Sequence, residues 1–138
     1  MKFVYDDGGR GAAGFKGEAD DCVCRSIAIA TGLPYREVYA LINAQSAKRG
    51  KKISSAREGV YKKDWRKIIE GLGWRWHPTM AIGKGCTMHL REGELPDGKL
   101  IVFVSKHLTA VINGVVHDTS NPSRGGTRCV YGYFTQGG

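Results

Sequence analysis

The chain has 138 residues, the length of one ordinary domain, and a formal net charge of +8. With 41% hydrophobic and 25% charged residues, its composition is that of a globular protein and excludes a disordered one. It contains no run of about 20 apolar residues, as a transmembrane helix needs, and residues 1–6 lack the apolar stretch of a secretory signal. We therefore expect a single domain over residues 1–138, cytoplasmic and without a membrane partner.

The sequence has four cysteines, and whether they are expected to form disulfides depends on whether the protein is cytoplasmic or secreted. A disulfide framework is not expected in the cytoplasm. The remaining roles are a small buried residue, a metal ligand or a catalytic thiol. The four are Cys22, Cys24, Cys86 and Cys129.

The first helix is expected directly after a glycine-rich loop over residues 6–19. Asp20 and Asp21 supply N-cap chemistry for a helix over residues 22–31, and Gly32 is a typical C-terminal stop. The apolar residues of this helix recur on one face, which predicts that it packs into the core. They are Val23, Ile27 and Ala30.

Two further helices follow, separated by a basic loop over residues 45–60. Pro34 is a natural first-turn residue and predicts the start of the second helix. A third helix is expected over residues 62–72, with apolar residues at helical spacing. Those residues are Trp65, Ile68, Ile69 and Leu72.

From residue 74 onward the pattern changes to that of strands. They are expected over residues 74–77, 100–104, 107–112, 115–118 and 127–134. The pair Asn113-Gly114 between two β-rich runs predicts a two-residue hairpin turn. Helices followed by strands indicate an α+β fold, in which N-terminal helices pack on a C-terminal antiparallel sheet.

The predicted hairpin brings a histidine and an aspartate together. A two-residue turn pairs Ala110 with His117 and places His107 and Asp118 on the same face. As diagonal neighbours, their Cβ atoms would lie roughly 7–8 Å apart or less, close enough for a His–carboxylate hydrogen bond. A three-residue loop would reverse the parity and place His117 beside His107 instead.

Cys22 begins the first predicted helix, where free backbone N–H groups favour a thiolate and can hold an oxyanion. Cys24 is the rival nucleophile, but it points about 200° away around the helix. A histidine held by a carboxylate and facing a thiol is the arrangement of a cysteine-based catalytic triad. Cys22, His107 and Asp118 can converge if helix 22–31 packs on the polar face of the hairpin.

Residues 21–28 (DCVCRSIA) and 106–118 (KHLTAVINGVVHD) carry a resemblance to the papain-like cysteine peptidase superfamily. The whole chain also resembles a set of short bacterial and phage proteins with the same pattern. The superfamily resemblance implies Cys22 as nucleophile, His107 as general base and Asp118 as the residue that orients the base. It also implies hydrolysis of an amide, isopeptide or thioester bond in a peptide or protein substrate, with no cofactor.

One departure from the superfamily concerns the oxyanion donor. Many papain-like enzymes carry a glutamine a few residues before the nucleophile, and residues 15–21 contain none. The backbone N–H of Cys22 is the remaining candidate donor, together with a donor from the glycine-rich loop.

A different class of function is suggested by the basic segment Lys48–Lys67. Such a segment attracts polyanions, so the alternative to a hydrolase is an inactive or non-enzymatic module that binds nucleic acid or an acidic protein. Tyr61 and Trp65 interleave with these charges, although the helical spacing of Trp65 indicates a core residue. Arg124 and Arg128 follow Asp118 in a turn-rich loop and are candidates for a substrate-binding rim that reads an acidic group.

A metal site is the third alternative. Cys86 and His89 have C-x-x-H spacing, and Cys22 with Cys24, or Cys129, could complete four ligands. Zinc sites usually show two clean ligand pairs, which this chain lacks. We therefore expect no metal ligands.

Overall fold

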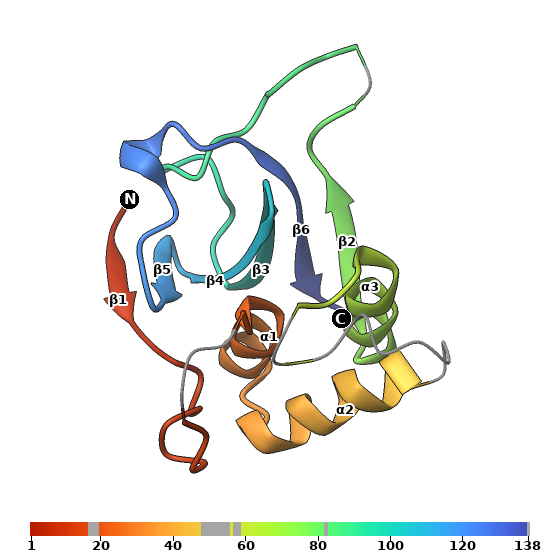
Figure 1. The fold of residues 1–138 in the computed structure, drawn as a ribbon. Coiled ribbons are helices and arrows are strands. Elements are labelled where there is room, and N and C mark those ends of the chain that lie inside the picture. Colours follow the sequence, from red (N-terminus) through yellow and green to blue (C-terminus); the bar gives the residue numbers. More distant parts are fainter. Residues whose placement is uncertain (17–19, 48–55, 57–58, 82, 138) are drawn as a thin grey trace.

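The computed structural model describes residues 1–16, 20–47, 56, 59–81 and 83–137. In this part of the chain, six strands form a mixed sheet in the order β1-β5-β4-β3-β6-β2, with β1 and β2 at its two edges (Figure 1). The strands are β1 (Phe3–Tyr5), β2 (Trp74–Pro78), β3 (Lys99–Val104), β4 (His107–Ile112), β5 (Val115–Asp118) and β6 (Val130–Gln136). The α+β class predicted from the sequence is confirmed.

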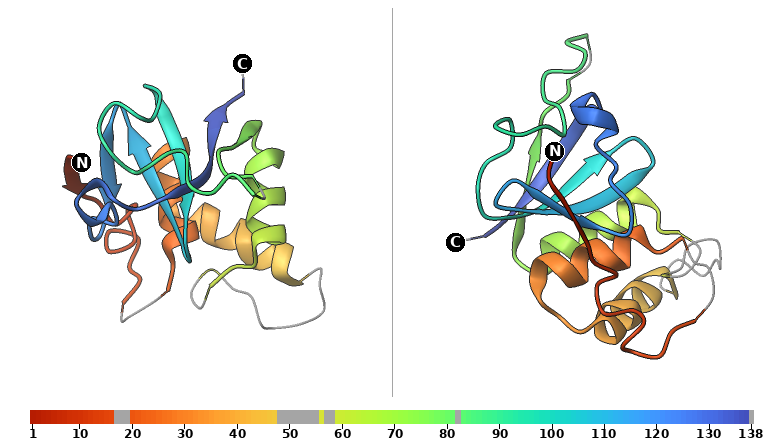
Figure 2. Two further views of the ribbon diagram at one scale, coloured as in Figure 1. Left: turned by 90° about the horizontal axis from the view of Figure 1, so that it is seen from above. Right: turned by 90° about the vertical axis from the view of Figure 1, so that its left-hand side faces the viewer.

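The described helices gather on one side of the sheet (Figures 1 and 2). They are α1 (Cys22–Thr31), α2 (Tyr35–Ala47) and α3 (Lys62–Gly71). The predicted limits of α1 are confirmed, and Gly32 ends it with a left-handed φ of 77°. Each of the other two helices also begins within one residue of the predicted position.

Each face of the sheet carries its own core. On the helix side, Ile27 of α1 and Trp65 of α3 pack with Ala110 and Phe134 of the sheet. The opposite face is covered by the long connection between β2 and β3, which contributes Leu90 and Leu95. This second layer supports the strands that carry the candidate site residues described below.

The β4–β5 hairpin has the register predicted from Asn113-Gly114, because Ala110 pairs with His117 and Val111 with Val116. Asn113 has the left-handed φ of 49° that such turns require. The expectation of a purely antiparallel sheet is wrong, because β1 pairs with β5 in parallel. A strand of three residues carries too little periodicity to be recognised in sequence.

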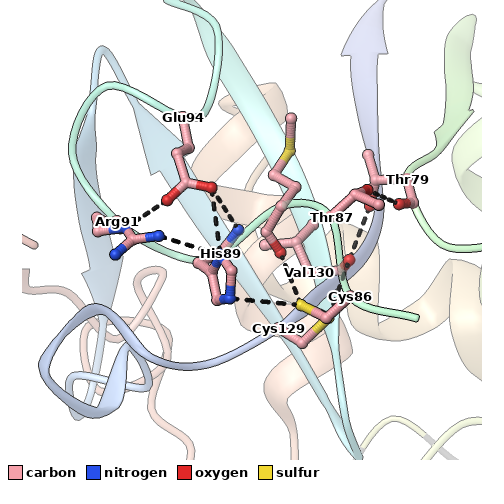
Figure 3. Close-up of a disulfide and its surroundings, with 9 residues drawn as sticks. Thr79, Cys86, Thr87, His89, Arg91, Glu94, Cys129 and Val130 are labelled. Carbon is pink, nitrogen blue, oxygen red and sulfur yellow. Dashed lines mark hydrogen bonds and ion pairs between the residues drawn. A yellow bond between two sulfur atoms is a disulfide. The ribbon is translucent and has the colours of Figure 1, made fainter. Parts of the chain in front are cut away.

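The structure also corrects the expectation that the cysteines form no disulfide, since Cys86 is bonded to Cys129 (Figure 3). The β2–β3 connection folds back onto the start of β6, where His89 and Cys129 form an isolated β-bridge. This contact brings the two cysteine Cα atoms to 5.8 Å, a normal separation for a disulfide. The partners are 43 residues apart, and no local pattern reveals their pairing.

Gly132 of β6 tests how closely β6 packs against the side chain and backbone of its neighbour β2. A Cβ atom there would lie 2.3 Å from Cη2 of Trp76 and 3.0 Å from the carbonyl oxygen of His77. We expect Gly132→Ala to lower the free energy of unfolding by about 1–3 kcal/mol, measured by urea denaturation. As a control, Gly71→Ala at the end of α3 meets no atom within 4 Å and should instead stabilise the protein by about 0.5–1 kcal/mol. Equal effects of the two substitutions would contradict this packing.

Candidate active site

Cys22 is the first residue of α1 and is partly exposed at the wall of a cavity of about 380 Å³. The wall combines aromatic, basic and acidic side chains from α1, α3 and the β3–β4 turn. They include Asp20, Lys62, Trp65, Phe103, Lys106 and His107. The thiol is therefore accessible to a ligand that enters this cavity.

His107, the first residue of β4, lies between the thiol and a carboxylate. Its Nε2 is 2.7 Å from Oδ2 of Asp118, and its side chain also forms a hydrogen bond with Cys22. Burial lowers the pKa of this imidazole, but the hydrogen bonds with Asp118 and Cys22 outweigh burial and raise the pKa to about 9. The ring is therefore an imidazolium at neutral pH, and Nδ1 is the nitrogen left to meet the sulfur.

Asp118, the last residue of β5, is 3% exposed and has several donors. Oδ2 accepts hydrogen bonds from His107 and, at 2.7 Å, from the hydroxyl of Thr109. Oδ1 accepts from the backbone N–H of Thr119 at 2.7 Å and lies 3.3 Å from Nη2 of Arg25. Burial alone would raise the pKa of this carboxyl, but the donors, His107 first among them, lower it below its usual range.

A second buried acid, Asp21, organises the beginning of α1. Its carboxylate forms an ion pair with Arg25, accepts a hydrogen bond of 2.7 Å from the Tyr35 hydroxyl and lies 3.6 Å from Arg10. These partners draw the Asp21 side chain away from the helix end, where it makes no cap hydrogen bond. The backbone N–H groups that begin α1 are therefore not covered by the expected Asp21 cap.

Arg25 is a residue of the candidate site that sequence analysis missed. It bridges Asp21, the residue before its own helix, and Asp118 on the sheet, and so joins the start of α1 to the β4–β5 hairpin. The i, i+4 spacing of Asp21 and Arg25 is a visible helical ion-pair signal. The contact with Asp118 spans 93 residues and has no such local signal.

Cys22, His107 and Asp118 lie at the end of the sheet, whereas the sequence analysis considered the polar face of the hairpin. Helix α1 packs on the opposite face, which carries Leu108 and Ala110. Because His107 begins β4 and Asp118 ends β5, both lie where the strands stop. The first turn of α1 reaches them there.

Cys24 has a different environment from Cys22. It is 0% exposed and its sulfur lies 3.7 Å from the carbonyl oxygen of Tyr35. Burial raises the pKa of its thiol to about 12. A neutral, enclosed thiol is a poor nucleophile, so the structure favours Cys22 of the two.

A second cavity of about 380 Å³ adjoins the first, and the two share Lys62 and Phe103. Its other walls are mainly apolar and come from β2, β6 and the segment after β2. They include Trp76, Pro78, Met80 and Tyr131. We refer to these two adjoining cavities together as the Phe103 groove.

Half of the basic segment Lys48–Lys67, residues 48–55 and 57–58, lies outside the described residues. On α3, the ammonium group of Lys62 lies 5.8 Å from the Trp76 ring, and the Arg66 guanidinium lies 5.3 Å from the same ring. Trp65 is 3% exposed and belongs to the core, so it offers no stacking platform to a nucleic acid. Of the basic residues in the described part of the segment, Lys62 lines the cavity beside Cys22.

The proposed metal ligands are not brought together. Cys86 is bonded to Cys129, while Cys22 and Cys24 lie on α1. Within the described ranges, no group of three or more His, Cys, Asp or Glu side chains is arranged to hold a metal ion. His89 lies 3.7 Å from the Cys86 sulfur and 3.3 Å from the Glu94 carboxylate (Figure 3).

No family model, curated protein or solved structure matches this chain. None of the described helices is long and apolar enough to cross a membrane.

The raised pKa of His107 gives a direct test of the site. We expect the imidazole of His107 to titrate near pH 9 by nitrogen-detected NMR, and well below that in Asp118→Asn, where burial is no longer opposed by the carboxylate. Because the folded-state pKa exceeds the ordinary 6.5, this proton stabilises the fold below pH 6.5. That stabilisation should disappear as the pH rises through about 9, with a slope of up to about 1.4 kcal/mol per pH unit. A midpoint at or below 6.5 would contradict the hydrogen-bonded arrangement.

Proposed function

We propose that this protein is a cysteine hydrolase of the papain-like type, which cleaves an amide, isopeptide or thioester bond. The observation that carries the proposal is the contiguous arrangement of Cys22, His107 and Asp118, with an imidazolium between an accessible sulfur and a buried carboxylate. A cysteine at the start of a helix, with its partners on two adjacent strands, also supports a papain-like architecture.

The first chemical step would form an acyl-enzyme. The Cys22 sulfur attacks the carbonyl carbon of the substrate, and the carbonyl π electrons move onto oxygen. The uncovered N–H groups at the start of α1 lie beside the sulfur and are suited to hold this oxyanion. When the tetrahedral intermediate collapses, the bond to the leaving group breaks, and the leaving amine takes the proton of His107.

The second step would return the free enzyme. The neutral His107 now accepts a proton from a water molecule, which attacks the acyl carbon. Collapse of the second intermediate breaks the C–S bond and releases an acid and the Cys22 thiolate. Asp118 stays ionised throughout and stabilises the imidazolium each time it forms.

The surroundings of the triad favour an extended peptide as substrate. Cys22 and Trp65 line one of the two cavities of the Phe103 groove, and Trp76 with other apolar side chains lines the second. Such walls bury apolar side chains, while a few polar groups set the orientation of the bound chain.

Alkylation by iodoacetamide tests the proposed thiolate–imidazolium pair without a known substrate. In the parent protein we expect peptide mapping to find rapid labelling of Cys22 at neutral pH and slow labelling of Cys24. His107→Ala should slow labelling of Cys22 at pH 7 by about tenfold or more, because a free thiol is only a few per cent ionised there.

His117→Ala is the matched control, since His117 lies on the same hairpin but interacts with Asp6 at 3.8 Å. We expect it to leave the labelling rate of Cys22 unchanged. If Cys24 reacts first, or if Cys22 reacts equally fast in His107→Ala, the triad is wrong as described. If the pair is present, fluorogenic peptide amides then identify the bond that is cleaved.

A further inference from the structure

Two lysines line the cavity beside Cys22. Lys62 is the first residue of α3, and Lys106 lies in the turn between β3 and β4. Arg124 and Arg128, the substrate-binding rim predicted from the sequence, line neither cavity of the Phe103 groove. The predicted arginine rim is thus not part of this groove, and the two lysines supply its ammonium groups.

Lys62 lies where the two cavities of the Phe103 groove adjoin, because it lines both. Its ammonium nitrogen lies 5.3 Å from the centre of the Phe103 ring and 5.8 Å from the centre of the Trp76 ring. Such contacts hold a cation against an aromatic wall, and they leave N–H donors of the ammonium group for an oxygen acceptor. Within the described ranges, the Lys62 side chain forms neither an ion pair nor a hydrogen bond. The ammonium group is therefore positioned at the groove with donors available to a ligand.

Arg66, one turn further along α3, gives an internal comparison. Its guanidinium lies 5.3 Å from the same Trp76 ring, but Nε also forms an ion pair of 2.8 Å with Glu70. Arg66 lines neither cavity. Of the two cations on one ring, the cation that lines the groove is thus the one that no described carboxylate balances.

Lys106 adds a second ammonium group to the wall of the cavity beside Cys22. It directly precedes His107 and has a φ of 57°, in the left-handed region that favours glycine. Such conformations are costly for other residues and cluster at ligand sites. A glycine would adopt this turn without strain, but the cavity would then lose one positive charge.

The net charge of the cavity wall follows from these side chains. The thiolate of Cys22 and the imidazolium of His107 balance each other in the proposed pair. Asp20 is the one acidic residue among the described residues of the wall, and it forms an ion pair with neither lysine. Two ammonium groups and one carboxylate leave the wall positive, and a concave site with low-dielectric walls strengthens the attraction for an anion.

We propose that Lys62 and Lys106 select a substrate that carries a carboxylate close to the bond attacked by Cys22. The carboxylate binds where the two cavities adjoin, beside the ammonium group of Lys62. The substrate class is an acidic peptide, whose carboxylate comes from a side chain or from the C-terminus. The connection with a substrate rests on the proposed hydrolase function, whereas the preference of the cavity for a carboxylate does not.

Iodoacetate and iodoacetamide test this preference on Cys22 itself. Both form an S–C bond with the thiolate and release iodide, but only iodoacetate carries a carboxylate. We expect the ratio of the two labelling rates, iodoacetate over iodoacetamide, to fall about threefold or more in Lys62→Gln at low ionic strength, and to fall in Lys106→Gln as well. A change in the pKa of the thiol affects both reagents equally and cancels in this ratio. Lys62→Arg retains the charge and should retain the ratio of the parent protein.

Arg66→Gln is the matched control, because it removes a cation from the same helix and the same Trp76 ring but from a residue outside both cavities. We expect it to leave the ratio unchanged. A ratio that does not change in Lys62→Gln, or that falls equally in Arg66→Gln, would overturn the proposal.

Protection of Cys22 from iodoacetamide then identifies the source of the carboxylate. Two peptides are compared: one contains glutamate and has an amidated C-terminus, and the other contains glutamine and has a free C-terminus. Stronger protection by the first assigns a side-chain carboxylate, and stronger protection by the second assigns a C-terminal one. Protection by neither peptide contradicts the assigned substrate class. If the ratio depends on Lys62 but labelling of Cys22 does not depend on His107, the carboxylate preference stands and the hydrolase proposal fails.

Discussion

The buried carboxylate of Asp118 is the interaction on which the rest of the site depends. A charge that is 3% exposed is tolerable only when it is fully paired, and this one is shared by His107, Thr109 and Arg25. Those partners come from β4 and α1, so the requirement to pair one charge determines how the helix and the hairpin meet. The same contacts keep the carboxyl ionised, and the ionised carboxyl keeps a proton on the imidazole.

Arg25 explains why the beginning of α1 is aimed at the end of the sheet. Its guanidinium lies between two buried acids, Asp21 and Asp118, each of which would be unstable without it. Because Asp21 turns inward to this ion pair, it does not cap α1, whose first residue, Cys22, lines the cavity. The network thus couples stability of the fold to the position of the Cys22 sulfur.

Local chemistry allowed much of the fold to be predicted. The end of α1 follows from Gly32, and the register of β4 and β5 follows from the Asn113-Gly114 turn, whereas Asp21 precedes α1 without making the expected cap hydrogen bond. What could not be predicted depends on long-range contacts: the parallel β1–β5 pairing, the Cys86–Cys129 disulfide and the bridge from Arg25 to Asp118. The proximity of His107 and Asp118 was predicted, but the face against which α1 packs was not.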